Sequence, residues 1–141
     1  MQRVPRHTAR VVPVADDGTC LLLLEEDPAR PGAPTWGTIG GAVDAGESTL
    51  EAAVRELREE TALRVGAGEL IGPVSERVHD YTWDAVAYVG RATVYALPLR
   101  RATAISFDHL QPAEIGSVLE ARWLSPGGGR GGRPAGLARP A

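Results

Sequence analysis

The segment from Ser48 to Thr61 most constrains the fold, because it combines a complete helix start with a single apolar stripe. Ser48 and Glu51 occupy the N-cap and N3 positions of a capping box, in which each side chain binds a backbone N–H of the first turn. Apolar or small residues then recur at helical spacing, at Leu50, Ala53, Val54, Leu57 and Thr61. The pattern predicts one amphipathic helix that buries this stripe.

Three glutamates crowd an adjacent face of the same helix. Glu56, Glu59 and Glu60 stand at positions i, i+3 and i+4, where like charges destabilise a helix by roughly 0.2–0.5 kcal/mol per pair. A divalent cation reverses the sign of that effect. Mg²⁺ takes oxygen ligands and shares its coordination shell among carboxylates, waters and phosphates. The three carboxylates therefore indicate a metal site.

The alternative is a solvated helix in which Arg55 pairs with Glu51 and with Glu59, four residues to either side. The Gly40-Gly41 turn and Glu47, which precede the helix, favour the metal site over this reading.

The whole window from residue 41 to residue 63 follows the pattern G-x5-E-x7-R-E-U-x-E-E-x-G-U, where U is a bulky aliphatic residue. The matching residues are Gly41, Glu47, Arg55, Glu56, Leu57, Glu59, Glu60 and Leu63. This pattern resembles the Nudix box, with Ala62 in place of the second glycine. The resemblance implies Mg²⁺-dependent cleavage of a diphosphate linkage in a nucleotide-like small molecule, with Mn²⁺ as a possible substitute cation.

The resemblance also implies a role for each matching residue. The metal ligands would be the carboxylates of Glu56, Glu59 and Glu60 and the backbone carbonyl of Gly40. Arg55 would orient a neighbouring glutamate through a charge-assisted hydrogen bond. Glu47 would have a secondary, partly structural role. Ala62 puts the end of the helix in question, because it allows one more turn before Gly66 stops the helix.

The general base is a box glutamate in some branches of this family and a carboxylate on a distant loop in others. Glu114 is our candidate for the distant position, and Glu120 and Asp108 follow it in preference. The catalytic residues that we expect are therefore Glu59, Glu60, Arg55 and Glu114. An ordinary acidic residue on a surface loop is the alternative for Glu114.

Substrate-recognition residues are less well marked. The aromatic residues able to stack on a base are Trp36, Tyr81, Trp83 and Tyr88. His79 and His109 are able to contact phosphate or transfer a proton. Packing in the core, for the aromatic residues, and an ordinary surface or strand position, for the histidines, are the alternatives.

The rest of the chain is rich in strand signals. The expected strands are Thr8–Val14, Thr19–Glu25, Thr35–Ile39, Leu70–His79, Tyr81–Val89, Arg91–Leu99 and Ala121–Leu124, and 111–120 is either a loop or a short helix. Asp16-Asp17-Gly18 predicts a hairpin, and Gly90 predicts another turn. Strands around one strong helix indicate an α/β (α+β) domain. The resemblance implies an α/β/α sandwich with a mixed sheet, but the glycines at 127–129 indicate that its C-terminal helix is missing or degenerate.

Length and composition divide the chain into a domain of residues 1–125 and a tail of residues 126–141. A chain of 141 residues suffices for one core and is too short for two. The Gly-, Arg- and Pro-rich tail buries too little apolar area to offset its ordering entropy, so we expect it to be disordered. The sheet face that a C-terminal helix would cover is then exposed, covered by residues 111–120, or buried in a homodimer.

The net charge and the short apolar runs argue against nucleic acids and membranes as partners. The net charge of −3 gives no reason to expect nucleic-acid binding, and no apolar run approaches the length of a membrane span. The single cysteine, Cys20, forms no intramolecular disulfide and falls in an apolar strand. A cytoplasmic location follows by default. A non-catalytic Nudix domain that binds a nucleotide-like ligand as a sensor or regulator is the competing hypothesis for function.

Overall fold

A computed structural model describes residues 2–125 of the protein. Its strands are β1 (Val4–Val14), β2 (Cys20–Glu25), β3 (Thr35–Gly37), β4 (Ile39–Ala42), β5 (Ile71–Trp83), β6 (Val86–Pro98) and β7 (Val118–Leu124). They accompany one α-helix, α1 (Thr49–Thr61), and one 3₁₀ turn, η1 (Ala67–Glu69), within the described part of the chain. This composition confirms the predicted α+β class.

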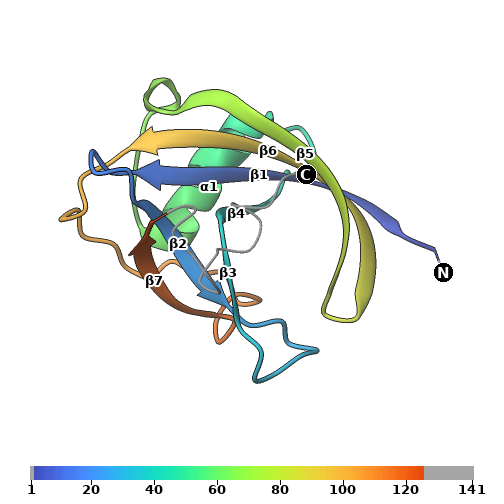
Figure 1. Ribbon diagram of the computed structural model, residues 1–141. Helices are drawn as coiled ribbons and strands as arrows, with labels where there is room; N and C mark the ends of the chain where they lie inside the picture. Colours follow the sequence, from blue (N-terminus) through green and yellow to red (C-terminus); the bar gives the residue numbers. More distant parts are fainter. Residues whose placement is uncertain (1, 126–141) are drawn as a thin grey trace.

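The strands form a single mixed sheet that is strongly curled (Figure 1). Its main path runs β3-β2-β1-β6-β5, while β4 pairs with β1 and β7 pairs with β2. The β1–β6 pair is parallel and the other pairs are antiparallel. Strand β1 is therefore the centre of the sheet, since it contacts β2 and β4 along one edge and β6 along the other.

Helix α1 packs on β1 and β4 through the predicted apolar stripe. Ala53 and Leu57 are fully buried against Ala9 and Val11, which lie on the helix-facing side of β1. The predicted capping box is present, because Ser48 Oγ accepts from the N–H of Glu51 and the Glu51 carboxylate accepts from the N–H of Ser48. Since the Glu51 carboxylate binds Ser48, it does not pair with Arg55.

The predicted end of α1 is wrong by one turn. Ala62 itself takes the left-handed conformation, at φ 68°, and its N–H donates to the carbonyl of Arg58. A residue in this conformation satisfies one of the last helical carbonyls and stops the helix, a role that glycine usually fills at lower energy. The chain therefore leaves the helix where glycine would have stopped it, and Gly66 instead precedes η1.

The predicted turn at Gly90 is also wrong. The structure has two strands of 13 residues each where three shorter ones were expected, and they turn at Asp84 and Ala85, which both have positive φ. Gly90 lies inside β6, opposite His79. A Cβ atom at this glycine would lie 2.5 Å from Cε1 of Tyr81, so glycine is required there because a tyrosine ring lies across the backbone.

Other predictions had mixed outcomes. The Asp16-Asp17-Gly18 hairpin is confirmed, and Cys20 is buried on β2. The expected strand at 35–39 is divided into β3 and β4, and residues 111–117 form turns with no helix before β7 begins at Val118. Predictions about the tail and the C-terminal helix fall on residues 126–141, outside those that the structure describes. No helix among the described residues is long and apolar enough to cross a membrane.

Candidate functional site

One cleft of about 780 Å³ collects most of the predicted site residues. Helix α1 supplies its acidic side, and strands β1, β4, β5 and β6 form its walls. The turns at residues 111–117 close it opposite the helix. The cleft therefore lies where segments distant in the sequence meet.

The Gly40-Gly41 turn allows α1 to approach the sheet closely. A Cβ atom at Gly41 would lie 2.7 Å from a carboxylate oxygen of Glu56. Gly40 has φ of +145°, and a Cβ atom there would collide with the backbone of Ala9 and Arg10. Glycine is thus required at position 40, where a side chain would displace β1, and a side chain at position 41 would push the Glu56 carboxylate out of its place.

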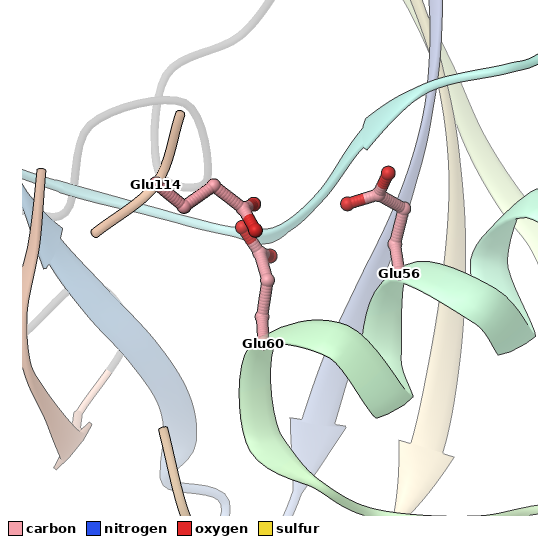
Figure 2. Close-up of side chains that lie close together, drawn as sticks. All are labelled: Glu56, Glu60 and Glu114. Atoms are coloured by element: carbon pink, nitrogen blue, oxygen red, sulfur yellow. The ribbon is translucent and has the colours of Figure 1, made fainter. Parts of the chain in front are cut away.

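Three carboxylates meet at the acidic end of the cleft (Figure 2). One oxygen each from Glu56, Glu60 and Glu114 lies within 4.8 Å of the others. Glu56 and Glu60 project from α1, and Glu114 approaches from the opposite side so that its carboxylate meets that of Glu60. Glu56 and Glu60 are only 6% and 2% exposed. We call these three residues the carboxylate cluster.

Burial and mutual repulsion dominate the electrostatics of the carboxylate cluster. Burial, followed by the hydrogen bond with Glu114 and the charges of Glu25 and Glu114, raises the pKa of Glu60 well above its usual value. The N–H of Gly40, which donates to Glu60 Oε1 at 2.7 Å, opposes that shift. Burial likewise raises the pKa of Glu56, against the lowering effect of Arg55. Without a counter-cation, Glu56 and Glu60 therefore hold their protons more tightly than an exposed glutamate does.

Arg55 holds the acidic end together. Its guanidinium binds both carboxylate oxygens of Glu47, at 2.7 and 3.0 Å, and one oxygen of Glu56, at 2.8 Å. It also donates to the carbonyl of Ala42 and lies 3.2 Å from Glu59. Hydrogen bonds to Glu47, then to Glu56, raise the pKa of Arg55 further, so it stays cationic. The expected orienting role of Arg55 and the structural role of Glu47 are both compatible with this geometry.

Glu59 lies beside the carboxylate cluster and is not part of it. Its carboxylate forms an ion pair with Arg55. This is one of the two pairs that the solvated-helix alternative predicted. Glu59 also borders a second, smaller cavity of about 190 Å³ that includes Arg58 and His109. Helical geometry explains the separation. Glu56 and Glu60, four residues apart, point in nearly the same direction from α1, whereas Glu59 is turned further away from both.

Glu114 is the only one of the three candidate distant acids that reaches the carboxylate cluster. The turn that carries it is closed by hydrogen bonds from the N–H of Gln111 to the Glu114 carboxylate and from the N–H of Glu114 to the Gln111 carbonyl. Glu120 instead pairs with Arg122 on β7, and Asp108 is an exposed loop residue.

Glu25 is a member of this cleft that the sequence interpretation missed. It is the last residue of β2, and burial raises its pKa to about 7, with Arg10 lowering it and Glu114 raising it. A Cβ atom on Gly37 would lie 2.6 Å from its carboxylate, so a side chain at this position would force the Glu25 carboxylate to move. The signal was a glutamate directly after a run of buried leucines, which is an unusual place for a charge.

The Gly40 carbonyl, an expected metal ligand, accepts a hydrogen bond from Arg10 at 3.1 Å. The same guanidinium nitrogen also donates to the carbonyl of Thr38 at 3.3 Å. The Gly40 carbonyl is therefore oriented toward a cation, here the guanidinium of Arg10. Arg10 thus joins strand β1 to the turn at the start of β4.

Three of the aromatic candidates, Trp36, Tyr81 and Trp83, line the cleft from β3 and β5, and Tyr88 on β6 stacks against Tyr81. Tyr81 stacks on both His79 and Tyr88, with ring centroids 5.2 Å apart in each pair. Trp83 continues the same face of β5, and Trp36 borders the cleft from β3. His109 lies in the smaller cavity next to Glu59.

The carboxylate cluster suits a hard divalent cation. All of its donor atoms are oxygens, which Mg²⁺ and Mn²⁺ accept as ligands. Two of the three carboxylates are buried with raised pKa values, and a cation would compensate the charges that burial penalises. The residues present therefore fit a divalent metal.

Comparisons with known proteins agree with this description. The family model of the NUDIX domain matches residues 5–129. The dihydroneopterin triphosphate pyrophosphohydrolase of E. coli is 22% identical, with 87% of this chain and 84% of that one covered and a TM-score of 0.63. A C. elegans Ap4A hydrolase is 19% identical, with 85% and 80% covered and a TM-score of 0.57.

A longer protein of Francisella tularensis also shares the fold. It is a bifunctional NMN adenylyltransferase/ADP ribose pyrophosphatase, in complex with AMP and a Mn ion. Identity is 18%, coverage is 90% of this chain and 36% of that one, and the TM-score is 0.59. A comparison with curated proteins found no significant match.

Proposed function

This chain belongs to the Nudix family, and we propose that it is a metal-dependent pyrophosphohydrolase. The substrate would be a nucleoside diphosphate linked to another group, and the reaction would break the diphosphate linkage. The observation that carries the proposal is the carboxylate cluster, in which Glu56, Glu60 and Glu114 converge within 4.8 Å at the end of an open cleft. A cluster of buried acids that repel one another is costly unless a cation binds them.

Glu56 and Glu60 of the carboxylate cluster would hold the cation, Mg²⁺ or Mn²⁺, together with the Gly40 carbonyl, which leaves Glu114 available as a proton acceptor. The cation would neutralise charge on the diphosphate oxygens and lower the pKa of an attacking water. The Mn ion in the Francisella structure supports this class of cofactor. Glu59, which lies beside the cluster, would join the ligands after a change of its side-chain conformation.

The protein's own residues would set the geometry of the reaction. Arg55 fixes Glu56 and Glu47 through charge-assisted hydrogen bonds, so that the carboxylates need little reorganisation when a substrate binds. Glu114 would accept the proton of the attacking water, since it faces the cleft and lies next to Glu60. Acceptance of that proton requires an ionised carboxylate.

The test is an assay of the purified full chain with Mg²⁺ or Mn²⁺ on a panel of diphosphate compounds. The panel includes nucleoside triphosphates, dinucleoside polyphosphates, NADH, ADP-ribose and nucleotide sugars. We expect phosphate, pyrophosphate or nucleotide release that depends on the cation. Saturable ligand binding with no cation-dependent release from any compound would falsify the enzyme proposal in favour of a ligand-binding role.

A further inference from the structure

Beyond the carboxylate cluster, the cleft is walled by alternate residues of β5. Side chains two residues apart on a strand point to the same face of the sheet. On β5 the residues that line the cleft are Arg77, His79, Tyr81 and Trp83. The wall therefore changes along this strand from a cationic side chain to aromatic rings.

The ring of Tyr81 is fixed on this wall. It leans from β5 across Gly90 of β6, since a Cβ atom at Gly90 would lie 2.5 Å from its Cε1 atom. Gly90 pairs with His79, and Tyr81 pairs with Tyr88. A ring that crosses from Tyr81 to Gly90 therefore passes between the two partner side chains, and both of them stack on it, with centroids 5.2 Å away. The guanidinium of Arg6 lies over the Tyr88 ring and extends this stack.

The packing of Tyr81 excludes the stacking role that the sequence suggested for it. A base stacks on an open face of an aromatic ring. His79 covers one face of the Tyr81 ring, and Tyr88 covers the other. The hydroxyl is the one polar group that this side chain can offer to a ligand.

The hydroxyl of Tyr81 is buried and has no hydrogen-bond partner among the residues that the structure describes. Buried tyrosine hydroxyls usually have a partner, because an unpaired one loses the hydrogen bonds that water would offer. Tyr95, which is buried on β6, follows this rule, since its hydroxyl lies 2.7 Å from Oγ1 of Thr49. Tyr81 is the exception, and its ring lines the cleft, where a ligand can supply the missing partner.

The position of Tyr81 along the cleft indicates which part of a substrate it meets. Arg6 on β1 lies opposite Gly90, and Arg10, four residues further along β1, lies opposite Gly40. Four residues of a strand span about 13 Å. The backbone of Gly40 contacts the carboxylate cluster. An extended nucleoside diphosphate whose phosphates lie at the cluster therefore brings its ribose and base to the level of Tyr81.

The surroundings of the hydroxyl suit a neutral polar group. Val4 and Tyr88 complete the row of Tyr81 across the sheet, and Trp83 follows it on β5. Burial, followed by the charges of two nearby arginines, lowers the pKa of His79, so its ring is neutral at neutral pH. A tyrosine hydroxyl both donates and accepts hydrogen bonds, which matches the mixed donors and acceptors of a ribose and a base.

We propose that Tyr81 is a substrate-binding residue whose hydroxyl hydrogen-bonds to the nucleoside part of the substrate. This assignment rests on the proposed function and deepens it, because it names a residue that recognises the nucleoside while the carboxylate cluster serves the diphosphate. The stack holds the ring in place before a ligand arrives, so little side-chain entropy is lost on binding. Because the hydroxyl is shielded from water, only a group that enters the cleft fully reaches it.

The first experiment compares the thermal unfolding of the ligand-free wild type with that of Tyr81→Phe and of the control Tyr95→Phe. Each variant loses one hydroxyl oxygen and keeps its ring. We expect Tyr81→Phe to melt at the same temperature as the wild type or higher, because it removes an unpaired buried hydroxyl. Tyr95→Phe should melt a few degrees lower, because it leaves Thr49 without its partner. An equal fall in Tyr81→Phe overturns the proposal, since it shows that the hydroxyl already has a partner, such as a bound water.

The second experiment measures binding without turnover, by calorimetry in the presence of Mg²⁺. Methylenediphosphonate is compared with the α,β-methylene analogues of ADP, GDP and UDP, which carry the same hydrolysis-resistant diphosphonate and add a nucleoside. We expect at least one nucleoside analogue to bind the wild type more tightly than methylenediphosphonate. Tyr81→Phe should reduce this advantage by about three- to tenfold, the contribution of one hydrogen bond, and leave methylenediphosphonate binding unchanged. Tyr95→Phe should bind every ligand as the wild type does.

The same titrations separate this assignment from the proposed function. No advantage for any nucleoside analogue, or an equal advantage in the wild type and in Tyr81→Phe, overturns the assignment even where hydrolysis is observed. Weaker binding of methylenediphosphonate itself by Tyr81→Phe also overturns it, because the hydroxyl then contacts phosphate. A nucleoside advantage that depends on Tyr81, in a protein that hydrolyses nothing, supports the assignment and overturns the hydrolase proposal.

Discussion

The two ends of the cleft carry opposite charges and differ in how the fold brings those charges together. The carboxylate cluster gathers buried negative charges from segments that are far apart in sequence, Glu56 and Glu60 on α1 and Glu114 on the turn before β7. A basic trough, formed by Arg6 and Arg10 on β1 and by Arg77 on β5, gathers positive charges from two strands on either side of β6, on a face that lines the cleft. Negative phosphates are attracted directly by the trough, whereas the cluster repels them unless a cation is present.

This difference indicates a division of labour. The trough arginines need only alternation along regular strands, so they resist small changes in neighbouring loops. The carboxylate cluster needs two glycines, an arginine with six acceptor contacts and a non-regular turn to bring its members together. We therefore expect substitutions at the acidic end to have larger and more specific effects than those at the basic end.

The largest effect should come from Glu60→Gln. Removing one charge of the carboxylate cluster should lower cation-dependent turnover by several orders of magnitude, while the melting temperature stays equal or rises because buried repulsion is relieved. Turnover and thermal unfolding of the same preparation test both parts. Glu120→Gln is the matched control, since Glu120 pairs with Arg122 outside the cluster. Near-normal turnover in Glu60→Gln would sink the metal assignment.

Arg55→Lys should have the next largest effect. Lysine keeps the charge but cannot bind both oxygens of Glu47 and also reach Glu56, so the carboxylates lose their orientation. We expect roughly a 10- to 100-fold fall in kcat, as for other residues that orient metal ligands. A steady-state assay at saturating cation checks the value. Wild-type kcat in this variant would show that Arg55 contributes only to packing.

A smaller effect should appear in the pH dependence of stability without divalent cations. The pKa of Glu25 rises from its usual value of 4.5 to about 7 on folding, so the folded protein binds the proton more tightly. Between these two values the free energy of unfolding falls as pH rises, and the stabilising effect of the proton is complete only below pH 4.5. Glu25→Gln removes the titration.

Denaturant unfolding of both proteins at pH 5 and pH 8 measures this contribution as a difference. From pH 5 to pH 8 we expect the free energy of unfolding of the wild type to fall relative to that of Glu25→Gln by on the order of 2–3 kcal/mol. Parallel pH profiles for the two proteins would show that Glu25 is ionised at little cost in the folded state.

The smallest effect should come from Ala62→Gly, because Ala62 caps α1 without lining the cleft. Glycine removes the steric cost of φ 68° but increases the entropy of the unfolded chain, so we expect a net stabilisation of about 0.5–1 kcal/mol. Equilibrium unfolding should show this gain, and turnover should be unchanged. A substantial change in turnover would show that the end of α1 positions Glu60.

The sequence predicted the parts of the site that depend on local spacing. The capping box, the apolar stripe and the shared face of Glu56 and Glu60 all follow from helical periodicity. Contacts between segments that are distant in the sequence were harder to predict. Glu25 was missed because only the fold shows that the end of β2 lies near the turn of Glu114, where the N–H of Glu26 donates to the carbonyl of Ser117.

The basic trough was missed for a related reason. Its arginines are visible as alternate residues of β1 and β5, but the parallel pairing of β1 with β6 that places them on either side of Ala92 and Gly90 is a tertiary property. The incorrectly predicted turn at Gly90 made this arrangement harder to predict, because it divided the single strand β6 into two. A glycine inside a strand signals close packing as often as a turn, and here Tyr81 supplies the packing.

Strand β1 serves both faces of the sheet, with Ala9 and Val11 under α1 and Arg6, Thr8 and Arg10 in the cleft. An insertion or deletion of a single residue in this strand would exchange the two sets, because a shift of one position turns every side chain to the opposite face. Arginines would then enter the core as alanine and valine entered the cleft. Point substitutions in β1 can alter one face at a time, but length changes in this strand must damage the core and the cleft together.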